Sequence, residues 1–214
     1  MSQLKTIVFR GREDKLAILG NLLRNYLTGD VLDVGCDAKY VSDFVHGRYV
    51  GVDIAGSPDL RVNVEIGLPF QDKTFDTVLA FDILEHLDCI YSAFTELCRV
   101  SRSYVIVGLP NMYEWHFRFL FMSGKNISGK YGLCIDPPVD RHRWLFNLDN
   151  AERFLRQRAD KHGFTVIEEA IGYYKYRKLF AKFMTVIGRR LSPHRASFFA
   201  YYYFVVLARK DHAV

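Results

Sequence analysis

The apolar positions of the chain follow two periods that alternate along its length. Mainly apolar runs of strand length cover residues 31–34, 49–53, 77–81, 103–109 and 164–168. Beside these runs, apolar residues recur at helical spacing over residues 13–27, 91–100 and 148–162. Strands that alternate with helices are typical of a parallel sheet with right-handed crossovers. The pattern therefore predicts an α/β fold.

The first two predicted strands each carry a carboxylate near their end. Asp33 lies two residues before Gly35, and Asp53 ends the second strand. A charge on an otherwise apolar strand is costly to bury, so we expect both at the carboxyl edge of the sheet, where open α/β folds bind ligands. Gly35 lets the backbone turn sharply or approach a ligand. An acid about 20 positions after such a turn can accept hydrogen bonds from both hydroxyls of a ribose.

The composition is that of a globular protein. Its 214 residues, half of them hydrophobic, can form a sizeable core, and we expect a single domain over residues 1–214. The four cysteines lack zinc-ligand spacing and the N-terminal residues lack a signal-peptide pattern, which favours a cytoplasmic setting and no metal site. The longest apolar run, 196–208, is shorter than the about 20 residues that span a membrane.

Positive charge is concentrated near the C-terminus. The formal net charge is +5, and in residues 171–214 Lys and Arg outnumber Asp and Glu by nine to one. A basic amphipathic helix predicted over residues 173–191 combines an apolar stripe with lysines. Such a helix either packs on the domain or makes peripheral contact with a membrane surface, and both interpretations stay open.

Five segments carry a family resemblance when they are read in order. They are the strand and turn at 31–36, the strand at 49–53, Leu68-Pro69-Phe70 with Asp72 and Phe75-Asp76, Leu84-Glu85-His86-Leu87, and the strand end at 107–111. Over about residues 28–111 the chain resembles class I S-adenosylmethionine-dependent methyltransferases, especially the small-molecule branch that includes ubiquinone-biosynthesis methylases. The resemblance implies a Rossmann-like, doubly wound, mostly parallel seven-stranded sheet with helices on both faces. It also implies an antiparallel last strand, over 197–209, at the sheet's edge.

The resemblance further implies S-adenosylmethionine as cofactor and a set of residues around it. Asp33 would face the methionine end of the cofactor, Gly35 would let the backbone approach it, and Asp53 would hold its ribose. Asn63 would lie near the adenine amino group, with Val64 and Phe81 flanking the ring. The full predicted set is Asp33, Gly35, Cys36, Asp37, Asp53, Ile54, Asn63, Val64 and Phe81.

Three positions depart from the family pattern. Asp37 and Lys39 follow Gly35 where the family usually continues G-x-G-x-G, Asn63 replaces an acid, and Ser101-Arg102-Ser103 replaces the usual Pro-Gly-Gly. A side chain at position 37 or 39 either points away from the cofactor or crowds it. A non-catalytic cofactor-binding or protein-interaction module on the same fold is therefore the alternative to an enzyme.

Residues 111–147 interrupt the alternation of strands and helices, and in the family such an insertion usually covers the substrate. It holds an aromatic helix candidate at 113–122 and a segment at 136–144 rich in proline, acids and arginine. Each stretch either packs as structure or contacts the acceptor. The candidates for a general base are His142, His86 and Glu114.

The activity expected from the resemblance is transfer of the sulfonium methyl group to an oxygen, nitrogen or carbon atom by in-line displacement. The aromatic insertion favours a small-molecule or lipid- or sugar-linked acceptor. Nucleic acid is disfavoured because the basic residues form one C-terminal block and no N-P-P-[YW] motif is present. The residues favour no particular oligomeric state.

Overall fold

The computed structural model describes residues 4–132, 135–136, 140–176, 183, 186 and 196–212. Within these residues one mixed sheet of eight strands runs in the order β1-β7-β8-β6-β5-β2-β3-β4. The strands are β1 Leu4–Phe9, β2 Thr28–Val34, β3 His46–Asp53, β4 Leu60–Arg61, β5 Phe75–Phe81, β6 Ser101–Pro110, β7 Phe164–Tyr174 and β8 Tyr202–Arg209. The predicted α/β fold class, mostly parallel and Rossmann-like, is confirmed.

The sheet differs from the expected one in two respects. It has eight strands and not seven, because β1 pairs in parallel with β7 at the sheet's edge. The alternation of apolar residues in β1 is too short and too mixed to stand out in the sequence. In addition, β8 does not lie at the edge: it is inserted between β6 and β7 and is antiparallel to both. Its nearly unbroken burial is that of a central strand.

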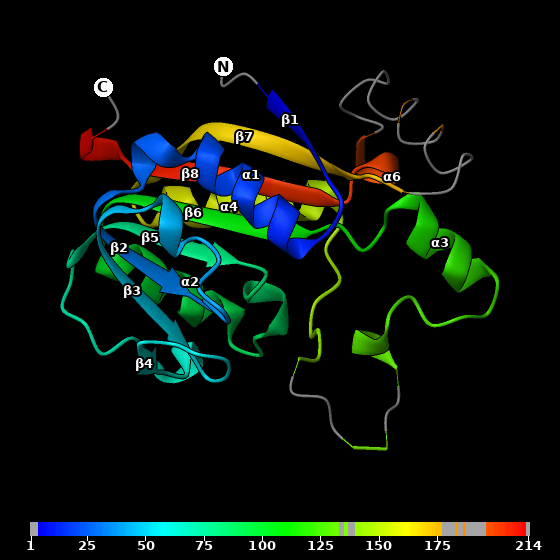
Figure 1. Ribbon diagram of the computed structural model, residues 1–214, viewed down its shortest axis with the longest axis horizontal. Coiled ribbons are helices and arrows are strands. Elements are labelled where there is room, and N and C mark those ends of the chain that lie inside the picture. The colour runs from blue at the N-terminus through cyan, green and yellow to red at the C-terminus, as the bar shows by residue number, and fades with distance from the viewer. Residues whose placement is uncertain are drawn as a thin grey trace.

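Helices cover both faces of the sheet, as Figure 1 shows for α1 on one side and α2 and α4 on the other. The helices are α1 Arg12–Leu22, α2 Ile90–Val100, α3 Trp115–Met122, α4 Leu148–Lys161 and α6 Ala196–Phe199. The short 3-10 turns are η1 Arg24–Tyr26, η2 Ser42–Phe44, η3 Val64–Ile66, η4 Leu84–His86, η5 Gly129–Tyr131 and η7 Lys210–His212.

Two hydrophobic clusters form the core, one on each face. Successive side chains of a strand point to opposite faces, so the α1 cluster takes Val31 and Leu79 while the α2 and α4 cluster takes Leu32 and Val78. These strands are buried on both faces, which is why they read as continuous apolar runs. The central strands are thereby fixed in place, and their carboxyl ends form a rigid edge.

The second half of the chain departs from prediction at two element boundaries. The predicted strand at 197–209 starts only at Tyr202, after the short helix α6. The helix predicted over 173–191 is wrong at its start, because β7 continues to Tyr174. Most of that segment lies outside the described residues. Among the residues that the structure does describe, no helix is long and apolar enough to cross a membrane.

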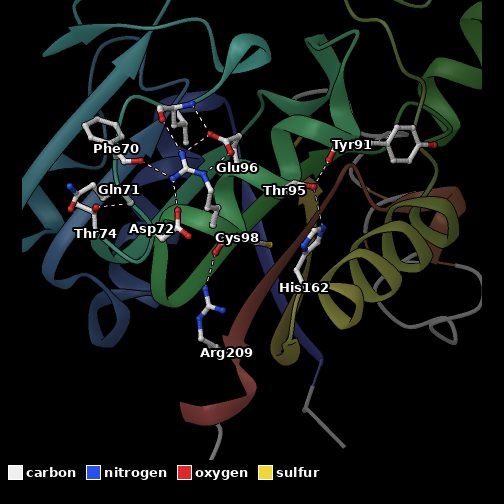
Figure 2. Close-up of polar contacts among 12 residues, drawn as sticks. Phe70, Gln71, Asp72, Thr74, Tyr91, Thr95, Glu96, Cys98, His162 and Arg209 are labelled. Atoms are coloured by element: carbon white, nitrogen blue, oxygen red, sulfur yellow. Dashed lines mark hydrogen bonds and ion pairs between the residues drawn. The ribbon is translucent and has the colours of Figure 1, made fainter.

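The Leu68-Pro69-Phe70 and Asp72 segment is bound to α2 through Arg99. Figure 2 labels Phe70, Asp72 and Glu96 in this region. The Arg99 guanidinium donates to the carbonyl oxygens of Leu68 and Phe70 at 3.0 and 2.7 Å and to the Asp72 carboxylate at 2.8 Å. Glu96 accepts from the same guanidinium and from the backbone N–H of Leu68. This segment therefore joins η3 to β5 as a braced structural link.

Candidate functional site

The described residues enclose a cavity of about 570 Å³ at the carboxyl edge of the sheet. Its walls come from the ends of β2, β3, β5 and β6, from α1, and from residues 110–142 that follow β6. This is the edge at which open α/β folds bind ligands, and the volume lies within the about 300 to 1,000 Å³ of ligand sites. Four of the predicted cofactor residues line it: Gly35, Asp37, Asp53 and Ile54.

The turn after β2 has a left-handed backbone conformation at the two positions where the family pattern has glycine and this chain has Asp37 and Lys39. Gly35 has φ 79°, and Asp37 and Lys39 also lie in the left-handed region, at φ 47° and 57°. A Cβ on Gly35 would come within 2.8 Å of the Ile83 side chain, so glycine is required there. The Asp37 carboxylate pairs with Arg12 at 2.6 Å, and Lys39 pairs with Asp59. The Lys39 side chain is thus directed toward Asp59, the residue before β4, whereas Asp37 lines the cavity.

Lys39 offers a test of backbone strain in this turn. Lys39→Gly and Lys39→Ala both remove the ion pair with Asp59, but only glycine removes the cost of a Cβ in the left-handed conformation. We expect Lys39→Gly to be more stable than Lys39→Ala by about 1 kcal/mol in urea unfolding. Equal stabilities would mean that the turn is not strained at this residue.

Asp53 stands at the end of β3 with both carboxylate oxygens engaged by backbone donors. One oxygen accepts from the N–H of Asp37 at 2.9 Å and the other from the N–H of Ala55 at 3.0 Å. An ionised carboxylate has about four acceptor sites, so each oxygen keeps capacity for a further donor. The two backbone bonds fix the orientation of the carboxylate at the cavity wall. Asp53 is therefore positioned to accept two more hydrogen bonds from a bound ligand.

Asp33 lies deeper than Asp53, beneath the cavity lining. It is 4% exposed and accepts a hydrogen bond of 2.8 Å from the Tyr49 hydroxyl. Burial raises the pKa of Asp33 to about 6, against the hydrogen bond from Tyr49, and the nearby Asp53 carboxylate adds to the rise. Cys36 is also buried, and burial beside these acids raises the pKa of its thiol to about 12. Neither Asp33 nor Cys36 lines the cavity in this conformation.

The three residues predicted around the adenine do not line this cavity. Asn63 is exposed and caps η3, its side-chain oxygen accepting from the N–H of Glu65 at 3.0 Å. Val64 packs in the cluster beneath α2, whereas Phe81 packs in the cluster beneath α1. The structure thus brings together the turn and Asp53, and leaves Val64 and Phe81 on opposite faces of the sheet.

The apolar part of the cavity lining comes from outside the central strands. Met112 and Phe117 reach it from the segment after β6, and Tyr174 and Tyr201 from the ends of β7 and β8. Phe117 and Tyr201 pack together with ring centroids 5.5 Å apart. Aromatic and apolar walls with a few polar groups are typical of small-molecule sites.

Lys15 and Asp82 are cavity residues that the sequence analysis missed. Lys15 of α1 is 5% exposed, pairs with the Asp82 carboxylate at 2.5 Å and lies 3.7 Å from the centroid of the Tyr202 ring. Asp82 has φ 53° directly after β5. The rule that selected Asp53, an acid directly after an apolar strand, also applies to Asp82 and could have found it. Lys15 carries no comparable sequence signal, because its partner lies far along the chain.

Two of the three candidate bases meet at the cavity, together with a buried carboxylate. The rings of His86 and His142 pack edge to face with centroids 4.5 Å apart, and Glu85 lies beside them at 1% exposure. Burial raises the pKa of Glu85 to about 8, with the Asp82 charge adding to the rise. Burial lowers the pKa of both histidines, that of His142 to about 4. Both imidazoles are therefore neutral at pH 7 and can accept a proton or bind a metal ion.

Glu114, the third candidate base, has a structural environment. Its carboxylate accepts from the N–H of His116 at 2.9 Å and from the Tyr176 hydroxyl at 3.1 Å, so it caps the start of α3. Burial raises its pKa to about 8. Glu114 is not among the residues that line the cavity. Its position supports a role in holding α3 rather than contact with an acceptor.

Comparison with known proteins finds a family match over the central strands. Residues 32–107, from β2 through most of β6, match the family model described as "Methyltransferase domain". No curated protein sequence matches the chain. Residues 32–107 are therefore similar to a methyltransferase domain, in line with the resemblance that the five segments carry, and S-adenosylmethionine is the cofactor of class I methyltransferases.

Solved structures share the fold across nearly the whole chain. Magnesium protoporphyrin IX methyltransferase from Synechocystis, solved with bound S-adenosylhomocysteine, is 14% identical with a TM-score of 0.58 over 92% of this chain and 83% of its own. A SAM dependent methyltransferase from Archaeoglobus fulgidus is 17% identical, with a TM-score of 0.58 over 94% and 96%. The methyltransferase domain of bacterial CtHen1 is 14% identical, with a TM-score of 0.58 over 92% and 97%. At these identities the likeness shows a common fold.

Proposed function

We propose that this protein transfers the methyl group of S-adenosylmethionine to a small-molecule or lipid- or sugar-linked acceptor. The observation that carries the proposal is the lining of one cavity, which holds both the Gly35 turn with Asp53 and the apolar side chains of Phe117 and Tyr201. A methyl donor at Gly35 and Asp53 and an acceptor at the aromatic side chains would share this cavity. The single-domain organisation over residues 1–214 is part of the proposal.

The turn and Asp53 supply what the donor end of such a ligand requires. The carboxylate of Asp53 would accept from the two ribose hydroxyls, because its remaining acceptor sites are free of the backbone bonds that orient it. The backbone at Gly35 would pass close to the donor. The left-handed conformations at Asp37 and Lys39 support this, since the turn keeps the course that a run of glycines would give it.

The segment 111–147 would act as the cover over the acceptor. Met112 and Phe117 from this segment, with Ser128, Lys130 and His142 further along it, line the cavity. The two ends of the segment are joined to each other, because the N–H of Met112 donates to the carbonyl of Phe146 at 2.9 Å. The first end is bound beside the start of β8, where the N–H of Asn111 donates to the carbonyl of Tyr201 at 2.8 Å. The second end is bound to η4, where the N–H of Arg143 donates to the carbonyl of Glu85 at 2.7 Å.

The chemistry requires little beyond alignment. In an in-line displacement the C–S bond of the sulfonium breaks, its electron pair stays on sulfur, and the acceptor atom forms the new bond to carbon. Holding donor and acceptor aligned can remove about 7 to 11 kcal/mol of the barrier, whereas a general base adds about 10²- to 10⁴-fold. With no metal ion bound, His86 and His142, which are neutral and line the cavity, would be the candidates to take a proton from the acceptor.

The acceptor class can be tested with methyl-labelled S-adenosylmethionine. The purified protein would be incubated with panels of aromatic alcohols and amines, of sugar- and lipid-linked hydroxy compounds in vesicles, and of nucleic acids and peptides. We expect label in a member of the first two panels, detected by mass. Label only in nucleic acid or peptide would overturn the acceptor class and leave the transferase activity standing.

A further inference from the structure

We propose that Glu85, His86 and His142 bind a divalent transition-metal cation at the acceptor side of the cavity. A second part of the proposal, which rests on the proposed methyltransferase function, is that the cation binds an oxygen atom of the acceptor. The site connects η4, the 3-10 turn after β5, to the covering segment 111–147. The sequence contains no cysteine pattern or metal-ligand spacing that predicts it.

The three side chains are already arranged around a common point. One ligand atom from each residue lies within 4.8 Å of the other two. Zinc-type ions hold nitrogen and oxygen ligands at about 2.0 to 2.2 Å, so ligand atoms around one ion are separated by about 3 to 4 Å. Side-chain adjustments of about 1 Å therefore suffice to close the site.

Glu85 is a second, independent indication of a bound cation. Its side chain is 1% exposed, and its Oε2 atom has no hydrogen-bond partner among the described residues. A buried carboxylate oxygen without a partner is costly, and native proteins seldom keep one without a cause. A cation between Glu85 and the two histidines would supply the missing partner.

Both histidines are oriented as metal ligands usually are. His86 Nδ1 lies 3.3 Å from the carbonyl oxygen of Arg141, and His142 Nδ1 lies 2.9 Å from the Tyr131 hydroxyl oxygen. In the tautomers that donate these bonds, each Nε2 carries the lone pair that a metal needs. Metal-binding histidines generally donate their other N–H to a carbonyl or similar group in this way.

The composition of the site indicates which ions fit and what they could do. Two imidazoles and one carboxylate suit Zn²⁺, Co²⁺ or Fe²⁺ better than Mg²⁺, and three protein ligands leave coordination positions open. Two lysines line the cavity, and the charge of each is offset by a carboxylate: Lys130 is paired with Asp140 at 2.6 Å, and Lys15 is paired with Asp82. The open positions would face the cavity that these residues line.

A metal-bound hydroxyl would become a better methyl acceptor. The cation lowers the pKa of the bound O–H, whose proton leaves to solvent. The oxygen then forms a bond to the methyl carbon as the C–S bond breaks, and the sulfur keeps the electron pair. The proposed acceptor class is therefore narrowed to compounds with a hydroxyl oxygen that can bind a metal ion.

Titration with Co²⁺ and with Zn²⁺ alone tests the site without activity. We expect about one ion per chain, a Co²⁺ visible absorption spectrum, and at least 100-fold weaker binding in Glu85→Gln and in His142→Ala. Tyr131→Phe should weaken binding by about 10- to 100-fold, as loss of a group that orients a ligand does. His162→Ala, at a histidine that instead bonds Thr95, is the matched control and should bind as the unaltered protein does.

The outcomes separate the two parts of the proposal. Unaltered protein that binds neither ion, or Glu85→Gln and His142→Ala proteins that are folded by circular dichroism and bind both ions normally, would overturn the site. S-adenosylhomocysteine affinity is measured on the same samples. Metal binding without cofactor binding would support the metal site and contradict the proposed function. Cofactor binding without metal binding would support the proposed function and contradict the metal site.

Discussion

Replacing Asp53 with asparagine is expected to weaken S-adenosylmethionine binding by about 10- to 100-fold while the fold is kept. The substitution preserves the shape of the side chain but removes the charge, and a hydrogen bond to a charged group contributes about 1.5 to 3 kcal/mol. Asparagine can still accept one of the two backbone N–H bonds that Asp53 now accepts, from Asp37 and Ala55. Titration calorimetry of the variant and the unaltered protein measures the loss.

Asp30→Asn is the matched control for this prediction. Asp30 lies on the neighbouring strand β2, away from the cavity, where it pairs with Arg48 at 3.0 Å. It should change cofactor affinity less than about twofold, because an exposed ion pair contributes about 0 to 1 kcal/mol to stability and does not touch the cavity. Unchanged affinity in Asp53→Asn would place the ribose elsewhere.

The second prediction concerns the change in the free energy of unfolding when Asp33 is replaced with asparagine. We expect this change to be about 3 kcal/mol more stabilising at neutral pH than at pH 4. Burial raises the pKa of Asp33 to about 6 in the folded protein, from 3.8. Between these values the folded protein holds a proton that the unfolded chain has released. The contribution of Asp33 to the free energy of unfolding therefore falls as the pH rises from about 4 to about 6, and stays low above it.

Asparagine has no such titration, and its side-chain oxygen can still accept from the Tyr49 hydroxyl. The difference in unfolding free energy between variant and unaltered protein should thus grow with pH through this window and then level off. Urea unfolding at a series of pH values measures it. A difference that is constant from pH 4 to pH 7.5 would show that Asp33 is ionised normally in the folded state.

The central strands and the ligand-binding edge could be predicted from sequence because they depend on local pattern. β2, β5 and β6 are buried on both faces over most of their length, so each appears as an apolar run, and Asp53 follows from its place at the end of β3. β1 could not be recognised in this way. Its place in the sheet is set by pairing with β7, which lies at the other end of the sequence.

The position of β8 and the grouping of Glu85 with two histidines also depend on distant segments. β8 is central because β6 and β7 both pair with it, and a single strand pattern carries no information on its neighbours. His142 reaches His86 because the covering segment returns to the turn after β5, where the N–H of Arg143 bonds the carbonyl of Glu85. Such contacts arise from tertiary packing and leave no local signal.

The directions of the side chains at positions 37 and 39, in the turn after Gly35, could not be predicted from the sequence. The sequence left two alternatives for side chains at 37 and 39, pointing away from the cofactor or crowding it. The structure pairs Lys39 with Asp59 and Asp37 with Arg12 and keeps both residues in the left-handed conformation. Asp and Lys can adopt this conformation at a modest cost, so loss of glycine need not change the path of the backbone.

Titration calorimetry of the unaltered protein with S-adenosylmethionine, and separately with S-adenosylhomocysteine, tests the central claim most directly. The account predicts binding of both at about micromolar affinity, with one ligand per chain, because the turn and Asp53 keep the geometry of a cofactor site. A folded protein that binds neither compound would contradict it, and would favour an interaction module built on the methyltransferase fold.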